Sequence, residues 1–383
     1  MKAIYSRLVG GNNGLTNIIL LAALLLVVLP LSLDIFRLNL VGKYLSFAFV
    51  ALGLVWLWGK AGVLSLGQGV FFGLGGYCMA MFLKLEASDP ESTKIQSTPG
   101  IPDFMDWNQL TALPSFWVPF KHLPFATIAV FVVPALVAFI VGTAMFKRRV
   151  GGVYFAIITQ AIALILSLGI DGNQGYTGGR NGITDLRTLW GWDIRTEHAQ
   201  YVLYFLTAGL LLGIILLSQW LLSGKLGKIL LAMRDREDRV RFSGYDVSML
   251  KVFTFCFAAA LSGLGGALFV LQVGFISPSL VGIVPSIEMV IFAAVGGRAS
   301  LYGAVYGTLL VNAGKSLFSE KFPQLWLFAM GGLFIAVVVL FPNGLAGVAD
   351  TVRKKFKPFM AKWKASRNEP APAGAITSAK GGE

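Results

Sequence analysis

The side chains of this chain that could perform chemistry are few and scattered. The two histidines, His122 and His198, stand apart, with no cluster of cysteine or histidine beside them that has metal-ligand spacing. The two cysteines, Cys78 and Cys256, each lie within an apolar run and are expected to be small core residues. We therefore expect no disulfide, no metal and no cofactor.

Two short motifs resemble catalytic ones but are incomplete. Gly314-Lys315-Ser316 resembles the end of a phosphate-binding loop, yet residue 309 is Leu where that motif requires Gly. Ser262-Gly263 resembles the nucleophile of an intramembrane serine protease, but no apolar run contains a histidine that could act as its base. The sequence predicts neither an ATPase site nor a catalytic residue, and we do not expect an enzyme.

Four polar residues interrupt apolar runs: Gln68, Gln160, Glu288 and Asn312. The three amides could hold helices together by interhelical hydrogen bonds, or they could line a polar pathway. An ionisable group at membrane depth is costly and indicates function, although Glu288 could instead cap a half-helix that begins after Pro285. Lys315 is expected to extend its ammonium to the outer surface.

The elements that position these residues are apolar helices. Hydrophobic residues make up 56% of the 383 residues and charged residues only 13%, against about 25% in soluble domains. A helix of about 20 residues crosses roughly 30 Å of hydrocarbon. Ten apolar segments lie at about 18–33, 41–58, 62–83, 123–146, 152–170, 200–222, 251–273, 284–295, 300–318 and 323–341. The sequence predicts an all-α polytopic membrane domain over residues 1–342 with about ten transmembrane helices.

Charge predicts the orientation of these segments. With both termini in the cytoplasm, 22 of the 32 Lys and Arg residues lie on the inner side. The net charge of +13 is then a consequence of topology, and no nucleic-acid partner is needed to explain it. Residues 343–383 form a basic cytoplasmic tail, in which we expect a membrane-surface helix followed by a disordered end.

A charged island at residues 223–250 separates the sixth and seventh apolar segments. One helical face carries four apolar residues at spacings of three and four: Leu226, Ile229, Leu230 and Met233. Such an amphipathic helix could lie on the lipid surface or dock into a groove on a partner protein. Gly244 ends the pattern.

The ten segments divide into two groups of five, and an odd group size inverts the second group relative to the first. The third segment of each group is broken, by Gly67-Gln68-Gly69 in one and by Pro285 in the other. Broken segments at corresponding positions of two halves point to a translocation site. The pathway candidates are Gln68, Tyr154, Gln160, Asn173 and Glu288.

The outer loop at residues 171–199 begins DGNQGYTGGRNGITDL and must turn sharply several times. It could be a surface loop with tight turns only. Alternatively, it lines the outer mouth of a pathway or receives a delivery protein. The candidates for that role are Tyr176, Thr177, Gly178, Gly179, Arg180 and Asn181.

Several motifs resemble the permeases of branched-chain amino-acid ABC importers. They include GKAGVLSLGQGVFFGLGGY, RRVGGVYFAIITQA, GYTGGRNGITDL, LLAMRDRED and SIEMVIFAAVGGRASLYGAVYG, in that order between Lys60 and Gly347. Within this family, DGNQGYTGGRNGITDL looks most like the second permease subunit of urea ABC importers. The resemblance implies a large-type importer fold with two pseudo-symmetric halves in the bacterial inner membrane.

The resemblance also implies partners: a second homologous permease, two cytoplasmic ABC ATPases and a periplasmic substrate-binding protein, within the lipid bilayer. The family's ATPase-coupling loop would fall on the island, at Leu226, Ile229, Leu230, Met233, Arg234, Asp235, Arg236 and Gly244. The expected function is that of a transmembrane permease subunit of an ATP-driven importer, with urea as the substrate. The alternatives are a branched-chain amino-acid importer permease and a self-sufficient secondary carrier or channel, which would not need the island helix.

Overall fold

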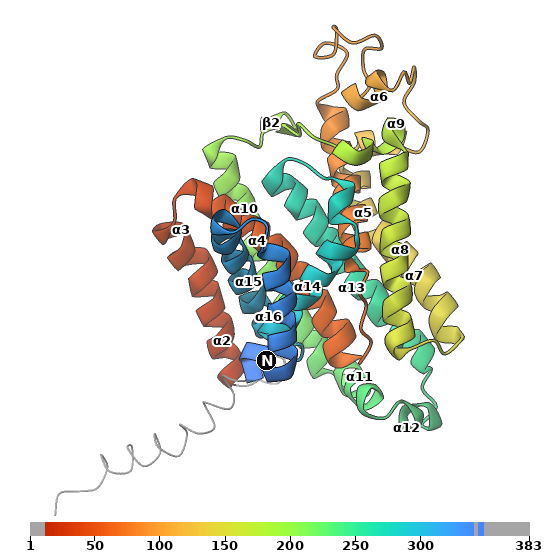
Figure 1. The fold of residues 1–383 in the computed structure, drawn as a ribbon, viewed down its shortest axis with the longest axis vertical. Coiled ribbons are helices and arrows are strands. Elements are labelled where there is room, and N and C mark those ends of the chain that lie inside the picture. Colours follow the sequence, from red (N-terminus) through yellow and green to blue (C-terminus); the bar gives the residue numbers. More distant parts are fainter. Residues whose placement is uncertain (1–11, 341–343, 348–383) are drawn as a thin grey trace, which may run out of the picture.

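The computed structural model describes residues 12–340 and 344–347 and is built almost entirely of helices (Figure 1). Most of the predicted basic tail and the charged residues Lys2 and Arg7 lie outside the described residues. The principal elements are α2 (Asn12–Ala23), η1 (Leu24–Val28), α3 (Leu29–Ser32), α4 (Ile35–Leu54), η2 (Val55–Lys60), α5 (Gln68–Glu86), α7 (Leu123–Lys147), α8 (Gly152–Gly172), α10 (Glu197–Ser223), α13 (Val247–Val273), α14 (Ile283–Gly296), α15 (Leu301–Lys321) and α16 (Trp326–Leu340).

Each of the ten predicted segments coincides with one of these helices or with a helix and its continuation. Among the described residues, six helices are long and apolar enough to cross a membrane, and three shorter apolar helices accompany them. The six are Ile35–Lys60, Gln68–Glu86, Leu123–Lys147, Gly152–Gly172, Glu197–Ser223 and Val247–Val273. The prediction of a multi-helix membrane protein is thereby confirmed, while the count of ten spans and the relation between two halves stay predictions.

Helix α13 lies at the centre and packs against α4, α5 and α7 (Figure 1). The apolar parts of α4, α5 and α13 are 83%, 94% and 78% buried, whereas those of α7 and α8 are 33% and 28% buried. In a bilayer the exposed apolar faces of α7 and α8 suit lipid or another apolar helix. The first three helices therefore form the core, and α7 and α8 lie at its edge.

Glycines allow α5 and α13 to approach closely. A Cβ atom at Gly266 would lie 1.8 Å from the carbonyl oxygen of Phe72, and one at Gly75 would lie 2.2 Å from the carbonyl oxygen of Gly263. Small residues at a helix contact let the backbones meet, which is how membrane helices gain packing energy. Side chains larger than glycine are excluded at these positions.

Two helices of the core begin after a break in the chain. Residues 61–67 belong to no helix before α5 begins at Gln68, and residues 274–282 contain only the short η5 (Pro278–Leu280) before α14 begins at Ile283. The beginnings of the two helices meet, because the backbone N–H of Gly69 donates to the hydroxyl of Ser286 at 3.1 Å. The predicted interruptions near Gly67–Gly69 and Pro285 thus lie at neighbouring places in the fold.

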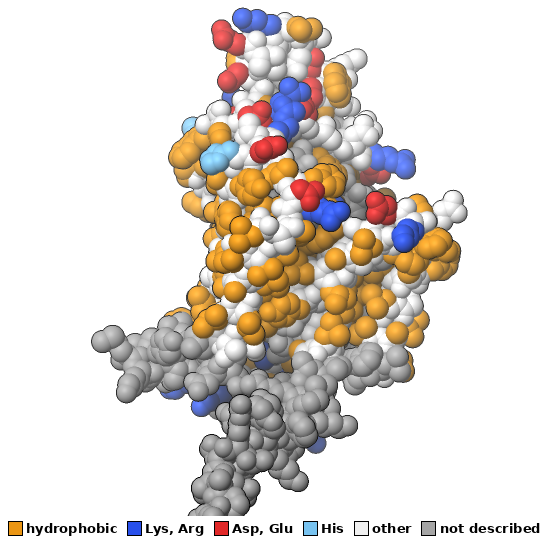
Figure 2. All heavy atoms as spheres, turned by 90° about the vertical axis from the view of Figure 1, so that its left-hand side faces the viewer, with side chains coloured by type: hydrophobic (Ala, Val, Ile, Leu, Met, Phe, Trp, Pro, Cys, Tyr) orange, Lys and Arg blue, Asp and Glu red, His pale blue; other side chains and the backbone are white. Residues whose placement is uncertain are grey.

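The two ends of the helical body differ. The loop end carries α6 (Asp103–Trp107), η3 (Val118–Lys121), α9 (Gln174–Thr177), η4 (Gly179–Asn181) and a hairpin of β1 (Thr188–Leu189) and β2 (Trp192–Asp193). The opposite end, here the island end, carries α11 (Lys225–Asp235) and α12 (Glu237–Phe242). Figure 2 shows hydrophobic side chains across the middle of one face and charged side chains gathered toward the loop end. This distribution matches a body that crosses a bilayer.

Candidate functional site

A cavity of about 1010 Å³ lies between α4, α14 and α15. Asp34, directly before α4, and Glu320, near the end of α15, line the part of it nearest the loop end. Lys43 lies eight residues beyond the start of α4, which at 1.5 Å per residue places it roughly 12 Å deeper. The cavity therefore reaches well into the membrane-spanning part of the chain.

An ion pair lies within the cavity. The ammonium of Lys315 donates to both carboxylate oxygens of Glu288, at 2.9 and 2.7 Å, and the two side chains are 36% and 15% exposed. Glu288 therefore does not cap α14, whose N-cap is Gly282, because it lies in the second turn of that helix. The prediction that Lys315 reaches the outer surface is wrong, since a carboxylate within the cavity binds it.

A second lysine lines the same cavity. Lys43 lies on α4, with its ammonium 5.9 Å from the ring centre of Phe269. Among the described residues, no carboxylate oxygen lies within 4 Å of the Lys43 ammonium. The deep part of the cavity thus contains two cations and one anion. Sequence alone does not single out Lys43, because it lies two residues inside the apolar segment that begins at 41, where a lysine is typical of a helix end.

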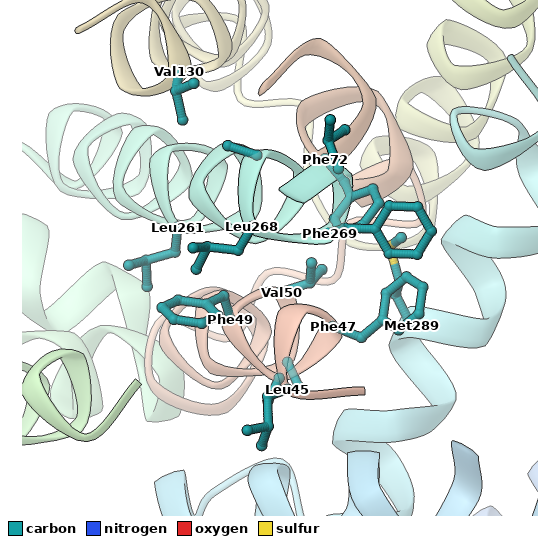
Figure 3. Close-up of a cluster of buried hydrophobic side chains, with 14 of the residues drawn as sticks. Leu45, Phe47, Phe49, Val50, Phe72, Val130, Leu261, Leu268, Phe269 and Met289 are labelled. Carbon is teal, nitrogen blue, oxygen red and sulfur yellow. The ribbon is translucent and has the colours of Figure 1, made fainter. Parts of the chain in front are cut away.

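Aromatic rings close the cavity on its island side. Phe47, Phe269 and Phe292 line it, and Phe72 of α5 packs behind them. The ring centre of Phe47 lies 5.2 Å from that of Phe72, 5.4 Å from that of Phe269 and 5.8 Å from that of Phe292. Figure 3 shows Phe47, Phe72 and Phe269 gathered beside Met289. These four phenylalanines are called the aromatic floor below.

Of the five predicted pathway residues, only Glu288 lines this cavity. Gln68 is fully buried, and its Oε1 accepts from the hydroxyl of Ser262 at 3.0 Å, while its Nε2 has no partner among the described residues. Gln68 thus makes an interhelical hydrogen bond, as one of the two alternatives from the sequence requires, and its part in a pathway stays a prediction. Asn312 bonds within its own helix, donating to the carbonyl of Thr308 at 2.8 Å.

The other three pathway candidates lie on α8 or directly after it. Tyr154 is 75% exposed, Gln160 is half-buried, and Asn173 donates to the carbonyl oxygen of Gly169 at 2.6 Å. Their helix is at the edge of the core, so the structure does not bring them to the cavity described above. A role for them in a pathway stays a prediction.

The island forms two helices rather than one, because the chain is extended at Arg236, between α11 and α12. Leu230 and Met233 are buried within the chain itself, and Leu226 and Ile229 pack against the same core. The prediction that this apolar stripe inserts into a partner is therefore wrong for its two buried members. Helical spacing shows that a stripe exists but not which surface covers it.

The outward surface of the island carries other apolar side chains. Phe242, at the end of α12, is 92% exposed, and Leu231 and Tyr245 are also exposed. Gly244 follows with φ +87°, in the left-handed region, and no described atom lies within 4 Å of a Cβ placed there. The exposed part of the island is thus a turn that presents an aromatic side chain.

Hydrogen bonds fasten both island helices to the core. The guanidinium Nη1 of Arg234 donates to the carbonyl oxygen of Gly59 at 2.9 Å, which ties α11 to the end of η2. Glu237 of α12 accepts from Arg241 at 2.9 Å and from Lys251 of α13 at 2.6 Å. A displacement of the island would therefore also displace the end of η2 and the start of α13.

The end of η2 also contacts the turn between α14 and α15. Lys60 donates to the carbonyl oxygen of Ala299 at 3.0 Å, and the Arg298 guanidinium lies 5.1 Å from the ring centre of Trp58. A Cβ atom at Gly59 would lie 1.8 Å from the carbonyl oxygen of Arg298, so only glycine fits. Gly59 with Lys60, Arg234, Arg298 and Ala299 is called the island junction below.

At the loop end, the predicted sharp turns are confirmed. Gly178, Gly179 and Gly182 have φ of +78°, +55° and +70°. Ile183 pairs with Ile276 as an antiparallel bridge, which joins this loop to the stretch before α14. Tyr176, Arg180 and Asn181 are exposed, and Thr177 bonds back to the end of α8. Their proposed part in a mouth or a docking surface stays a prediction.

A buried lysine joins the two long loops. Lys84, whose side chain is 7% exposed, donates to the Asp103 carboxylate at 2.9 Å and to the carbonyl oxygen of Thr184 at 3.1 Å. Nearby, the hydrogen bond from the Arg187 guanidinium lowers the pKa of the Asp185 carboxyl below its usual value. Lys84 thereby fixes both loops to the end of α5.

Comparison with known proteins places this geometry in a family. The family described as "Branched-chain amino acid transport system / permease component" matches residues 36–338. The LivM permease of Salmonella typhimurium, a high-affinity branched-chain amino acid transport permease, is 26% identical over 321 residues, 78% of this chain and 67% of its own length. Its counterpart in Escherichia coli is 25% identical over the same shares.

A third relative, from Methanocaldococcus jannaschii, is a probable branched-chain amino acid transport permease. It is 25% identical over 234 residues, which are 57% of this chain and 66% of its own length. No solved structure shows significant similarity to the chain. The family match covers all helices that build the cavity, the aromatic floor and the island. The chain therefore belongs to the permease family of branched-chain amino acid transport systems.

Proposed function

We propose that this chain is the membrane subunit of an ATP-driven importer of branched-chain amino acids. It forms the translocation pathway with a second homologous permease. Two cytoplasmic ATPases bind at the island end, and a periplasmic binding protein delivers substrate at the loop end. The observation that carries the proposal is the cavity, which has charged groups in its depth, an aromatic floor on its island side, and a connection to an island that bears an exposed aromatic side chain.

The orientation follows from the charges. The island contributes six Lys and Arg residues to the side that is cytoplasmic in the proposal, and Lys251, Lys60 and Arg298 lie on the same side. Cytoplasmic loops of membrane proteins carry such an excess. Both termini then face the cytoplasm, and the cavity opens to the periplasm.

The island is the coupling element in this proposal. Leu230 and Met233 hold α11 on its own chain, while Leu231, Phe242 and Tyr245 remain for the ATPase groove, with Asp235, Arg236 and Gly244 beside them. An exposed aromatic side chain with charged neighbours is the composition that protein interfaces favour. The proposed contact surface therefore consists of other residues of the island than the apolar stripe that the sequence singles out.

Motion passes from the island to the cavity through short covalent and hydrogen-bonded steps. Arg234 holds the Gly59 carbonyl, and the stretch 61–67 continues from this junction to the start of α5. Phe72 of the aromatic floor lies on the second turn of that helix. Displacement of α11 by the ATPases would move Phe72 away from Phe47 and open the floor toward the cytoplasm. Packed elements with two arrangements transmit such shifts.

Urea is the second candidate substrate, because the run DGNQGYTGGRNGITDL resembles the second permease subunit of urea importers. Urea is neutral and rich in hydrogen-bonding groups, so amide linings would suit it. The charged groups within the cavity and the substrate named for the relatives favour amino acids instead. A self-sufficient carrier is the remaining alternative, and it would leave the exposed aromatic of the island without a function.

Uptake of labelled leucine and labelled urea by cells that lack this subunit, and by the same cells with the chain restored, tests the proposal. We expect loss and recovery of leucine uptake with unchanged urea uptake. The reverse pattern would assign urea as the substrate. Activity of the chain alone in liposomes, without any ATPase, would contradict the ABC mechanism altogether.

A further inference from the structure

We infer that the cavity recognises its substrate as a zwitterion, with Lys43 binding the carboxylate and Glu288 the ammonium. The hydrocarbon side chain then rests on the aromatic floor. This inference rests on the proposed function, because it specifies how an amino acid is held in the cavity.

The charged side chains of the cavity indicate which group can bind a substrate carboxylate. Lys315 and Glu288 neutralise each other, whereas Lys43 stands in the same cavity without a carboxylate within 4 Å among the described residues. A cation in a partly dehydrated site attracts an anionic group more strongly than it does in water. Lys43 is therefore the group of the cavity that is available for a substrate carboxylate.

The carboxylate of Glu288 can bind the ammonium group of the substrate. A carboxylate offers about four lone-pair positions on its two oxygens, and Lys315 occupies one on each. A carboxylate can therefore accept a hydrogen bond from an α-ammonium group while its pair with a lysine persists. Because Glu288 lies on α14 and Lys43 on α4, a ligand between them would also bridge the two helices.

The apolar wall of the cavity can bind the hydrocarbon side chain of the substrate. Phe47, Phe269, Phe292 and Met289 line the cavity on the island side of the charged groups. A branched hydrocarbon side chain that points toward them would leave water for an apolar surface, which is favourable. The cavity, about 1010 Å³, is at the upper end of the range for small-molecule sites, so leucine fits together with water.

The arrangement makes different demands of different ligands. An amino acid satisfies the lysine, the carboxylate and the apolar wall simultaneously. Urea carries no charge for Lys43 or Glu288 and no hydrocarbon for the floor. Removing the charge of Lys43 should therefore weaken amino-acid binding and leave the binding of a neutral or cationic ligand almost unchanged.

The test is equilibrium binding of labelled leucine to the purified membrane complex of both permeases and both ATPases. The binding protein is left out, so that its own selectivity does not contribute. Competing ligands are 3-methylbutylamine, which lacks the carboxylate, and 4-methylpentanoate, which lacks the ammonium. Variants are Lys43→Gln and Glu288→Gln, with Lys94→Gln in an exposed loop as the control.

We expect Lys43→Gln to weaken leucine binding about tenfold or more, as the loss of a charge-assisted hydrogen bond does. Competition by 3-methylbutylamine should be unchanged in this variant, because that ligand never used Lys43. Glu288→Gln should give the mirror result, with weaker leucine binding and unchanged competition by 4-methylpentanoate. Lys94→Gln should bind leucine as the unaltered complex does.

Glu288→Gln leaves Lys315 without its carboxylate and could disturb folding, so the double variant Glu288→Gln/Lys315→Gln is measured alongside it. Equal leucine affinity of Lys43→Gln and the unaltered complex would overturn the inference, as would an absence of leucine binding to the unaltered complex. If the complete importer with its binding protein still carried leucine in either case, the proposed function would stand. Uptake of urea and not of leucine by the complete importer would reject the proposed function itself.

Discussion

The Arg234 guanidinium on α11 donates a 2.9 Å hydrogen bond to the carbonyl oxygen of Gly59 at the end of η2. Arg234 lies in the exposed island, and Gly59 precedes the broken stretch that leads to α5. The proposed coupling element is thereby joined to a helix that contributes to the aromatic floor.

Replacing Arg234 by Glu removes the bond to Gly59 and sets a carboxylate against a carbonyl oxygen. We expect the ATPases to remain bound while substrate-stimulated ATP hydrolysis and uptake fall about tenfold, since hydrogen bonds to charged groups contribute about 1.5–3 kcal/mol. Arg236→Glu alters the exposed face instead and should reduce the amount of ATPase that co-purifies. Normal substrate-stimulated hydrolysis in Arg234→Glu would contradict this transmission route, and Arg195→Glu at the loop end is the control.

Substitutions at Gly244 test the turn that follows α12. Proline fixes φ near −65°, whereas Gly244 has φ +87°, so Gly244→Pro must change the path of the chain. Asparagine enters the left-handed region at much lower cost, and no described atom would contact its Cβ. We expect both variants to insert into the membrane and only Gly244→Pro to lose coupling, measured as substrate-stimulated ATPase activity. Equal loss in both would mean that glycine is needed for another reason.

Substitutions at Phe242 and Leu230 distinguish the surface of the island that is proposed to bind the ATPase from the surface that packs against its own chain. Phe242→Ser should leave the unfolding free energy of the permease within about 0.5 kcal/mol, because exposed side chains contribute little, but should weaken ATPase binding. Leu230→Ala should instead cost about 2–5 kcal/mol of stability, because Leu230 is fully buried. Co-purification and thermal unfolding together measure the difference. Undiminished ATPase binding in Phe242→Ser would place the contact elsewhere.

Phe72→Ala should open the aromatic floor. It removes the ring that packs behind Phe47 and Phe269 and leaves a void on the island side of the cavity. We expect leucine to cross proteoliposome membranes without ATP through this variant, at the further cost of about 3–5 kcal/mol of stability. Phe116→Ala, in an exposed loop, should show neither effect. If leucine did not cross the proteoliposome membrane without ATP through Phe72→Ala, a different constriction would close the pathway.

Asp103→Asn should destabilise the loop end by about 2 kcal/mol or more, because it leaves the buried ammonium of Lys84 without its counter-charge. Lys84→Met combined with Asp103→Asn should be milder, since no unpaired charge remains. The rate at which a protease cleaves the loop at residues 87–122 measures the difference between the single and the double variant. The same rate in the single and the double variant would show that this ion pair does not hold the loop.

The sequence alone predicts the helical segments well, because a continuous apolar run must become a helix in lipid whatever surrounds it. It also predicts the turns at Gly178, Gly179 and Gly182, where the residue type itself permits the conformation. Periodicity could not show that Leu230 faces its own chain, because burial depends on which helices lie beside α11. For the same reason it could not bring Lys43 to Glu288, which are 245 positions apart in the sequence and belong to different helices.

The glycine contact between α5 and α13 has a consequence for motion. Where Gly75 meets Gly263 and Gly266 meets the backbone at Phe72, the two backbones touch directly. Helices whose backbones touch can shear by small amounts, and here such a shift changes the Gln68–Ser262 hydrogen bond and the Phe72–Phe269 contact. Such a shift carries Phe72 with α5 while α13 stays in place. The small residues of the core would therefore allow α5 to slide along α13. In this way a movement that the ATPases cause at the island end would become an opening at the membrane centre.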